Sequence, residues 1–179
     1  MMRIFHQWVL ALALYSALSC EGLVSVYIQH LAIHGFIAPV FVLPIAVMII
    51  NLIDDLNVQE YWLALGAGVI ADLYFWGIIG IYTVFLPVSV WCCHRLARIL
   101  PDFWLFRWIV VLVGTSCLTV YIWLILNFMD LASISVISLW QNLFGNLIMS
   151  SVLFGCTYWL WVWLSQSYPF LVDLDAYRK

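Results

Sequence analysis

Long apolar stretches, separated by short polar ones, run from one end of the chain to the other. An apolar run of about 20 residues is long enough to cross the hydrocarbon core of a membrane as a helix. The pattern therefore predicts a bundle of about six transmembrane helices. Their expected ranges are 4–19, 36–52, 61–76, 81–96, 106–126 and 137–164.

Two of the expected connections are more polar than the rest. Residues 21–35, EGLVSVYIQHLAIHG, form a semi-polar segment that we expect to lie along the membrane interface or to re-enter the membrane. Asp54, Asp55, Asn57 and Glu60 form a short acidic stretch. Because charge runs are usually solvated, we interpret this stretch as a loop in water rather than as paired catalytic carboxylates.

Composition supports the membrane interpretation. Apolar residues make up 67% of the 179 residues and charged residues only 8%, a balance that a soluble domain of this size could not keep in solution. Six spans leave no room for a separate catalytic domain, so residues 1–179 are expected to form a single, compact, all-α polytopic membrane domain. The net charge of -3 is spread over the loops and gives no reason to expect nucleic acid as a partner.

The positive charges predict the orientation. With six spans, Arg3, the segment 95–107 and the pair Arg178 and Lys179 all fall on one side of the membrane, and the opposite connections contain no Lys or Arg. This is the positive-inside pattern. A multi-pass protein with both termini in the cytoplasm is therefore expected.

One carboxylate interrupts the third apolar run. Asp72 stands in the stretch 66–80, GAGVIADLYFWGIIG, with apolar residues on both sides. A lone acid in hydrocarbon costs about 2.5 kcal/mol or more on insertion scales. We therefore expect Asp72 to face the protein interior or a polar cavity.

Small residues flank this acid. Gly66, Gly68 and Ala71 precede it, and they are expected to let another helix approach closely. Gly77 and Gly80 follow it, and glycine permits a tight reversal of the chain. The stretch is thus expected to form a helix, a turn and the start of a second helix around one polar spot.

The sixth apolar run carries its own polar residues. Asn142 and Asn146 share a helix face one turn apart, with Gly145 beside them. Amides in membrane helices usually form hydrogen bonds to neighbouring helices. We interpret Asn142 and Asn146 as natural partners for Asp72.

The chain offers little that resembles a catalytic or metal site. His30 and His34 stand four residues apart and could face one metal ion, but nothing nearby completes a ligand set. The nucleophile elbow, the phosphate-binding loop and the dinucleotide fingerprint do not occur. Neither enzymatic activity, nor a metal, nor a cofactor is expected.

The order of these features resembles the rod shape-determining MreD family, whose members are short membrane proteins with about six spans. Their most recognisable stretch is a glycine, three apolar residues and an aspartate, then two glycines and a further apolar span. The corresponding residues here are Gly68, Asp72, Gly77 and Gly80, followed by IYTVFLPVSV. Phe75 and Trp76 stand where smaller residues are common in the family, so the turn is expected to be bulkier.

The resemblance implies a non-enzymatic scaffold of the elongasome in the bacterial inner membrane. Family members pair with the bitopic protein MreC. With the actin-like MreB, the glycosyltransferase RodA and a penicillin-binding protein, they direct lateral peptidoglycan synthesis and cell shape. Besides the lipid bilayer, these are the partners that the resemblance suggests.

A second interpretation belongs to another class of protein. Six glycine-rich spans with a polar interior also describe the substrate-binding subunits of energy-coupling vitamin transporters, to which the MreD family is thought to be similar in fold. Asp72, Asn142, Asn146 and the tryptophans would then line a vitamin pocket, and residues 21–35 would form its lid. Only Ala13 and Ala17 supply a small-xxx-small surface for an energising subunit.

Overall fold

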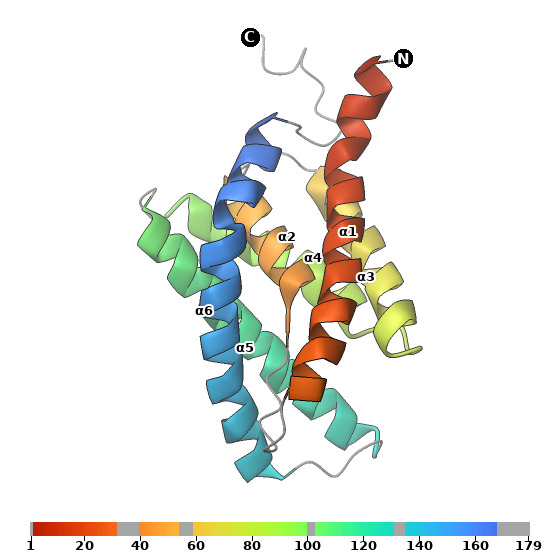
Figure 1. Ribbon diagram of the computed structural model, residues 1–179, viewed down its shortest axis with the longest axis vertical. Coiled ribbons are helices and arrows are strands. Elements are labelled where there is room, and N and C mark those ends of the chain that lie inside the picture. The colour runs from red at the N-terminus through yellow and green to blue at the C-terminus, as the bar shows by residue number, and fades with distance from the viewer. Residues whose placement is uncertain (1, 32–39, 54–58, 100–102, 131–134, 168–179) are drawn as a thin grey trace.

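The computed structural model describes residues 2–31, 40–53, 59–99, 103–130 and 135–167. Within these ranges the chain forms six α-helices and no β-strand, so the expected all-α class is confirmed (Figure 1). The helices are α1 (Met2–Leu31), α2 (Val42–Ile53), α3 (Gln59–Phe75), α4 (Tyr82–Ala97), α5 (Trp104–Phe128) and α6 (Val136–Ser167).

Three stretches are long and apolar enough to cross a membrane. They are Trp8–Tyr27 within α1, the whole of α5 and the whole of α6. The other helices are shorter, with 12 residues in α2, 17 in α3 and 16 in α4. At 1.5 Å per residue these three are about 18 to 26 Å long, less than the ~30 Å hydrocarbon core. The helices thus fit a membrane protein, in which three elements have the length and composition of full spans.

The first helix differs from the prediction. Instead of a span over 4–19 and a separate segment over 21–35, α1 runs without interruption to Leu31. Glu21, the acid that suggested an end to the apolar run, is only 2% exposed and has hydrogen-bond partners on two other helices. Because its carboxyl group forms hydrogen bonds inside the bundle, it does not end the helix. Residues 32–35 lie outside the described part of the chain.

The centre of the bundle is α2, which contacts α1, α4, α5 and α6. All residues from Val42 to Leu52 are buried, as expected for a helix that is apolar on every side. It begins at Val42, and not at Phe36 as predicted; residues 36–39 lie outside the described ranges. Pro44 falls in its first turn, where the missing N–H group disturbs no helical hydrogen bond.

The remaining helices form two pairs, α3 with α4 and α5 with α6, that are connected in sequence and packed side by side. Figure 1 shows α2 within the bundle that these pairs and α1 make. Glu60 belongs to the first turn of α3 and is 1% exposed, so its assignment to a solvated acidic loop was wrong. An acid at this position is favoured by the helix dipole. Asp54, Asp55 and Asn57 lie outside the described residues.

Candidate functional site

Asp72 lies in the last turn of α3 and is completely buried. Its carboxylate accepts four hydrogen bonds. Oδ1 accepts from the backbone N–H of Tyr82 at 2.6 Å. Oδ2 accepts from the backbone N–H of Gly80 at 2.8 Å and from the N–H and hydroxyl of Thr83 at 3.0 and 2.7 Å. All four donors belong to the turn after α3 or to the first turn of α4.

These donors explain why the chain has an acid here. The first N–H groups of a helix have no partner within the helix, and Ile81, at the N-cap position of α4, provides no side-chain cap. The carboxylate of Asp72 takes over that role from the preceding helix. The partial positive charge at a helix N-terminus also favours an anion at this position.

Three glycines allow the carboxylate to reach these donors. Gly77 and Gly80 have φ angles of 65° and 138°, a backbone conformation that residues with a Cβ rarely adopt. Gly68 lies against the first turn of α4, because a Cβ at this position would stand 2.7 Å from the carbonyl oxygen of Tyr82 and 2.8 Å from Cα of Thr83. The start of α4 therefore rests directly on the backbone of α3.

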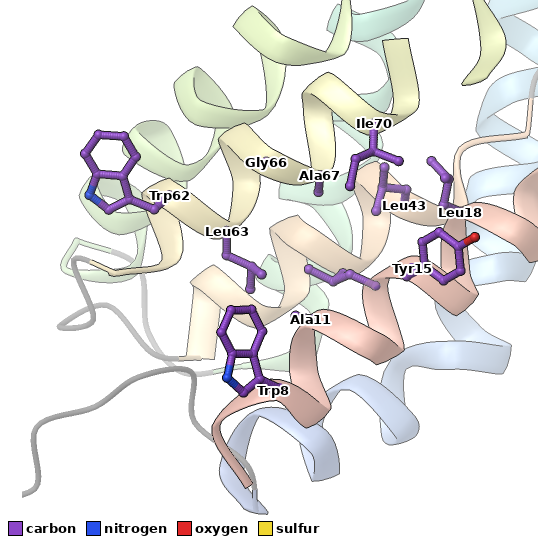
Figure 2. Close-up of a pocket in the computed structure, with 11 residues that line it drawn as sticks. Trp8, Ala11, Tyr15, Leu18, Leu43, Trp62, Leu63, Gly66, Ala67 and Ile70 are labelled. Atoms are coloured by element: carbon purple, nitrogen blue, oxygen red, sulfur yellow. The ribbon is translucent and has the colours of Figure 1, made fainter. Parts of the chain in front are cut away.

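Gly66 has a different role from Gly68. A Cβ added at Gly66 would meet nothing within 4 Å, so no other helix among the described residues packs closely on it. Gly66 instead lines an open apolar groove of about 330 Å³ between α1 and α3 (Figure 2). The groove residues are Trp8, Ala11, Leu14, Tyr15, Leu18, Leu43, Trp62, Leu63, Gly66, Ala67 and Ile70.

The two asparagines of α6 do not join Asp72. Asn146 is completely buried, and its Oδ1 accepts a hydrogen bond from the hydroxyl of Ser150 at 2.9 Å, one turn further along the same helix. Asn142 is half-buried on α6. The expected pairing is not formed because the turn and α4 supply the hydrogen bonds of Asp72, while α6 packs on α5 and α2.

Glu21 is a second buried acid with the same role, which the sequence analysis missed. Its Oε2 accepts a hydrogen bond from the backbone N–H of Leu43 at 2.7 Å, in the first turn of α2. Its Oε1 accepts from the phenolic hydroxyl of Tyr82 at 3.0 Å. Like Asp72, it is an isolated acid in an apolar stretch, SALSCEGLVSVY, and that pattern was the available signal.

Tyr82 connects the two acids. Its backbone N–H binds Asp72 and its hydroxyl binds Glu21, so this residue links α3 and α4 to α1 and, through Glu21, to the start of α2. We call Glu21, Tyr82 and Asp72 the acid–tyrosine network. Its hydrogen bonds all come from the chain itself, an arrangement that stabilises helix starts in an apolar interior.

The part of the chain that the structure describes contains no group of three or more His, Cys, Asp and Glu side chains that could hold a metal ion. His34 lies outside that part. Comparison with protein families, with curated proteins and with solved structures finds no match to this chain.

Proposed function

We propose that this protein is a non-enzymatic scaffold in the bacterial inner membrane that binds MreC within the machinery for cell elongation. In this proposal all six helices cross or enter the membrane and both termini are cytoplasmic. Through MreC the protein joins MreB, RodA and a penicillin-binding protein in directing lateral peptidoglycan synthesis and cell shape. The proposal rests on the resemblance in the stretch Gly68, Asp72, Gly77 and Gly80.

The observation that best supports this proposal is that Asp72 accepts its hydrogen bonds from the protein's own backbone and side chains. A carboxylate that acts in catalysis or binds a substrate must reach the reacting or bound group. Asp72 instead accepts four hydrogen bonds from its own hairpin, and Glu21 accepts bonds from α2 and Tyr82. The acids therefore shape the bundle, and the outward apolar faces are left to make contacts in the membrane plane.

The groove between α1 and α3 is the face that we assign to the transmembrane helix of MreC. Ala11, Gly66 and Ala67 provide small side chains along it, and small residues let two helix backbones come close in a membrane. The indole rings of Trp8 and Trp62 lie toward one end, and Tyr15 toward the other (Figure 2). A helix seated there would contact both α1 and α3.

A pair of glycine variants tests this assignment. Gly66→Leu places a larger side chain in the groove, at a position where an added Cβ meets nothing within 4 Å. Gly155→Leu is the matched control, since Gly155 on α6 is equally open. We expect Gly66→Leu to reduce co-purification with MreC from native membranes and to disturb rod shape, while Gly155→Leu retains both. Equal behaviour of the two variants would contradict the assigned groove.

The vitamin-transporter interpretation makes a different prediction. It requires a small molecule that travels with the purified protein, and a lid formed by residues 21–35. Residues 21–31 are the last three turns of α1, and Glu21 is fixed against α2, so this part is not an independent lid. Mass spectrometry of the purified, denatured protein distinguishes the two functions, because a stoichiometric vitamin-like ligand would favour the transporter.

A further inference from the structure

The turn between α3 and α4 is unusually apolar for a loop. Residues 76–81 read WGIIGI, and Ile79 is 59% exposed. Turns that face water are usually built from polar residues together with glycine and proline. An exposed pair of isoleucines at this position therefore suggests an apolar environment.

Several backbone groups of this turn have hydrogen-bond partners within the chain. The N–H groups of Trp76 and Gly77 donate to the carbonyl oxygen of Asp72 at 3.0 and 2.8 Å, and the N–H of Gly80 donates to its carboxylate. The carbonyl oxygen of Gly80 accepts from the hydroxyl of Tyr121 at 3.0 Å. Such internal partners are what non-helical backbone needs where water is excluded.

The contact with Tyr121 indicates how deep the turn lies. Tyr121 is seven residues before Phe128, where α5 ends. At 1.5 Å per residue, its Cα lies about 10 Å from the end of that membrane-spanning helix. Because the hydroxyl of Tyr121 bonds to Gly80, this end of the turn meets α5 before α5 ends, while Ile78 and Ile79 line a groove that reaches Phe128.

A second contact, between α4 and α1, also indicates the depth of the turn. From Glu21, α1 continues for at least six more residues, about 9 Å, to Tyr27. The Tyr82 hydroxyl at the start of α4 bonds to this carboxylate. In Figure 1 the lower ends of α1, α5 and α6 extend below the α3–α4 turn.

We propose that the α3–α4 turn ends inside the hydrocarbon layer, where lipid acyl chains of the nearer leaflet cover Ile78 and Ile79. The carboxylate of Asp72 then supplies the acceptors that water supplies to the first N–H groups of an ordinary helix. Glu21 does the same for the start of α2. This proposal concerns the membrane itself and does not depend on the identity of the protein partner.

The surface beside the turn fits an acyl chain. A groove of about 510 Å³ lies between the turn and the end of α5, and its side chains include Ile78, Ile79, Leu124, Ile125 and Phe128. Phe128, the last residue of α5, is 92% exposed, and α5 is long and apolar enough to cross a membrane. The hydroxyl of Tyr121, its one polar side-chain group, already donates to Gly80. An apolar chain is the partner that such a surface can accommodate.

Thiol labelling of the full chain in liposomes tests the depth of the turn. Ile79→Cys places a thiol at the tip, and Ser135→Cys places one before α6, whose 32 residues extend about 48 Å and so reach beyond the ~30 Å core. A membrane-impermeant maleimide should label Ser135→Cys, but it should label Ile79→Cys no more than the parent with its five native cysteines. Both thiols should react after denaturation in detergent. Comparable labelling of the two positions in intact liposomes would overturn the proposal.

A photo-crosslinker identifies what shields the turn. Benzophenone-alanine in place of Ile79, in vesicles of phosphatidylethanolamine and phosphatidylglycerol, should yield lipid adducts of the protein on illumination. Size-exclusion chromatography of each variant provides the control for folding. Crosslinking to a second copy of the chain in place of lipid would contradict the assignment to acyl chains. A failure of MreC binding would leave both liposome results unchanged, so this proposal and the proposed function are tested separately.

Discussion

The hydroxyl of Tyr82 donates a hydrogen bond of 3.0 Å to Oε1 of Glu21, although the two residues are 61 positions apart in the sequence. Tyr82 also donates its backbone N–H to Asp72, so one residue at the start of α4 is bound to both Glu21 and Asp72. The starts of α2 and α4 are therefore stabilised by a shared network. We therefore expect the packing of α1 to α4 to depend on the acid–tyrosine network.

Tyr82→Phe should destabilise the protein by about 1–3 kcal/mol, because it leaves Oε1 of the buried Glu21 without its donor. The benzene ring keeps the packing, so the loss reports the hydroxyl. Tyr74→Phe is the matched control, since Tyr74 is exposed on the neighbouring helix. Thermal unfolding in detergent, followed with a thiol-reactive dye, measures the difference. Equal melting temperatures for the two variants would show that the bond to Glu21 adds no stability.

Glu21 and Tyr82 should be coupled energetically. In a double-mutant cycle of Glu21→Gln and Tyr82→Phe, the effects of contacting residues are not additive, and couplings of about 0.5–3 kcal/mol are usual. We expect the double variant to be less damaged than the sum of the single variants. Glu21→Gln with Tyr74→Phe supplies the comparison, for which additivity is expected. Additive losses in both cycles would argue against the network.

Asp72→Leu should cause a larger loss than Asp72→Asn. Leucine removes every acceptor for the N–H groups of Gly80, Tyr82 and Thr83. The N–H of Tyr82 is buried, and an unsatisfied buried donor costs about 1–3 kcal/mol. Asparagine keeps one oxygen and so retains part of the cap. The yield of monodisperse protein and its melting temperature should fall in the order wild type, Asn, Leu. Full stability of the Leu variant would mean that the cap is unimportant.

Periodicity and charge predicted the all-α class, the apolar helices and the special position of Asp72, because these properties depend on residues that are close in sequence. The role of Glu21 could not be predicted in the same way. A single acid has the same local pattern whether it ends a helix or lies inside one, and its partners, Leu43 and Tyr82, are distant in the chain.

The asparagines show the same limit. The spacing of Asn142 and Asn146 placed them on one helix face, but it contained no information on which helix that face contacts. In the structure, α6 packs on α5 and α2, whereas the donors to Asp72 come from α4 and the turn before it. Asn146 instead accepts a hydrogen bond from Ser150 of its own helix. The sequence likewise could not show that Gly68, and not Gly66, lies against α4. That contact depends on where α4 begins, which the turn at Gly77 and Gly80 determines.

Gly68→Ala and Gly66→Ala should therefore have opposite effects on stability. At Gly68 the new methyl group would stand within 3.0 Å of backbone atoms of Tyr82 and Thr83, so α4 must move away and the bonds to Asp72 must lengthen. Overpacking of this kind costs about 1–3 kcal/mol. At Gly66 the methyl group meets nothing, and the higher helix propensity of alanine should stabilise the variant by up to about 1 kcal/mol. Melting temperatures of the two variants, measured side by side in one detergent, test the contrast. If Gly68→Ala melted at the same temperature as the wild type, the close contact between α3 and α4 would not be needed for the hydrogen bonds to Asp72.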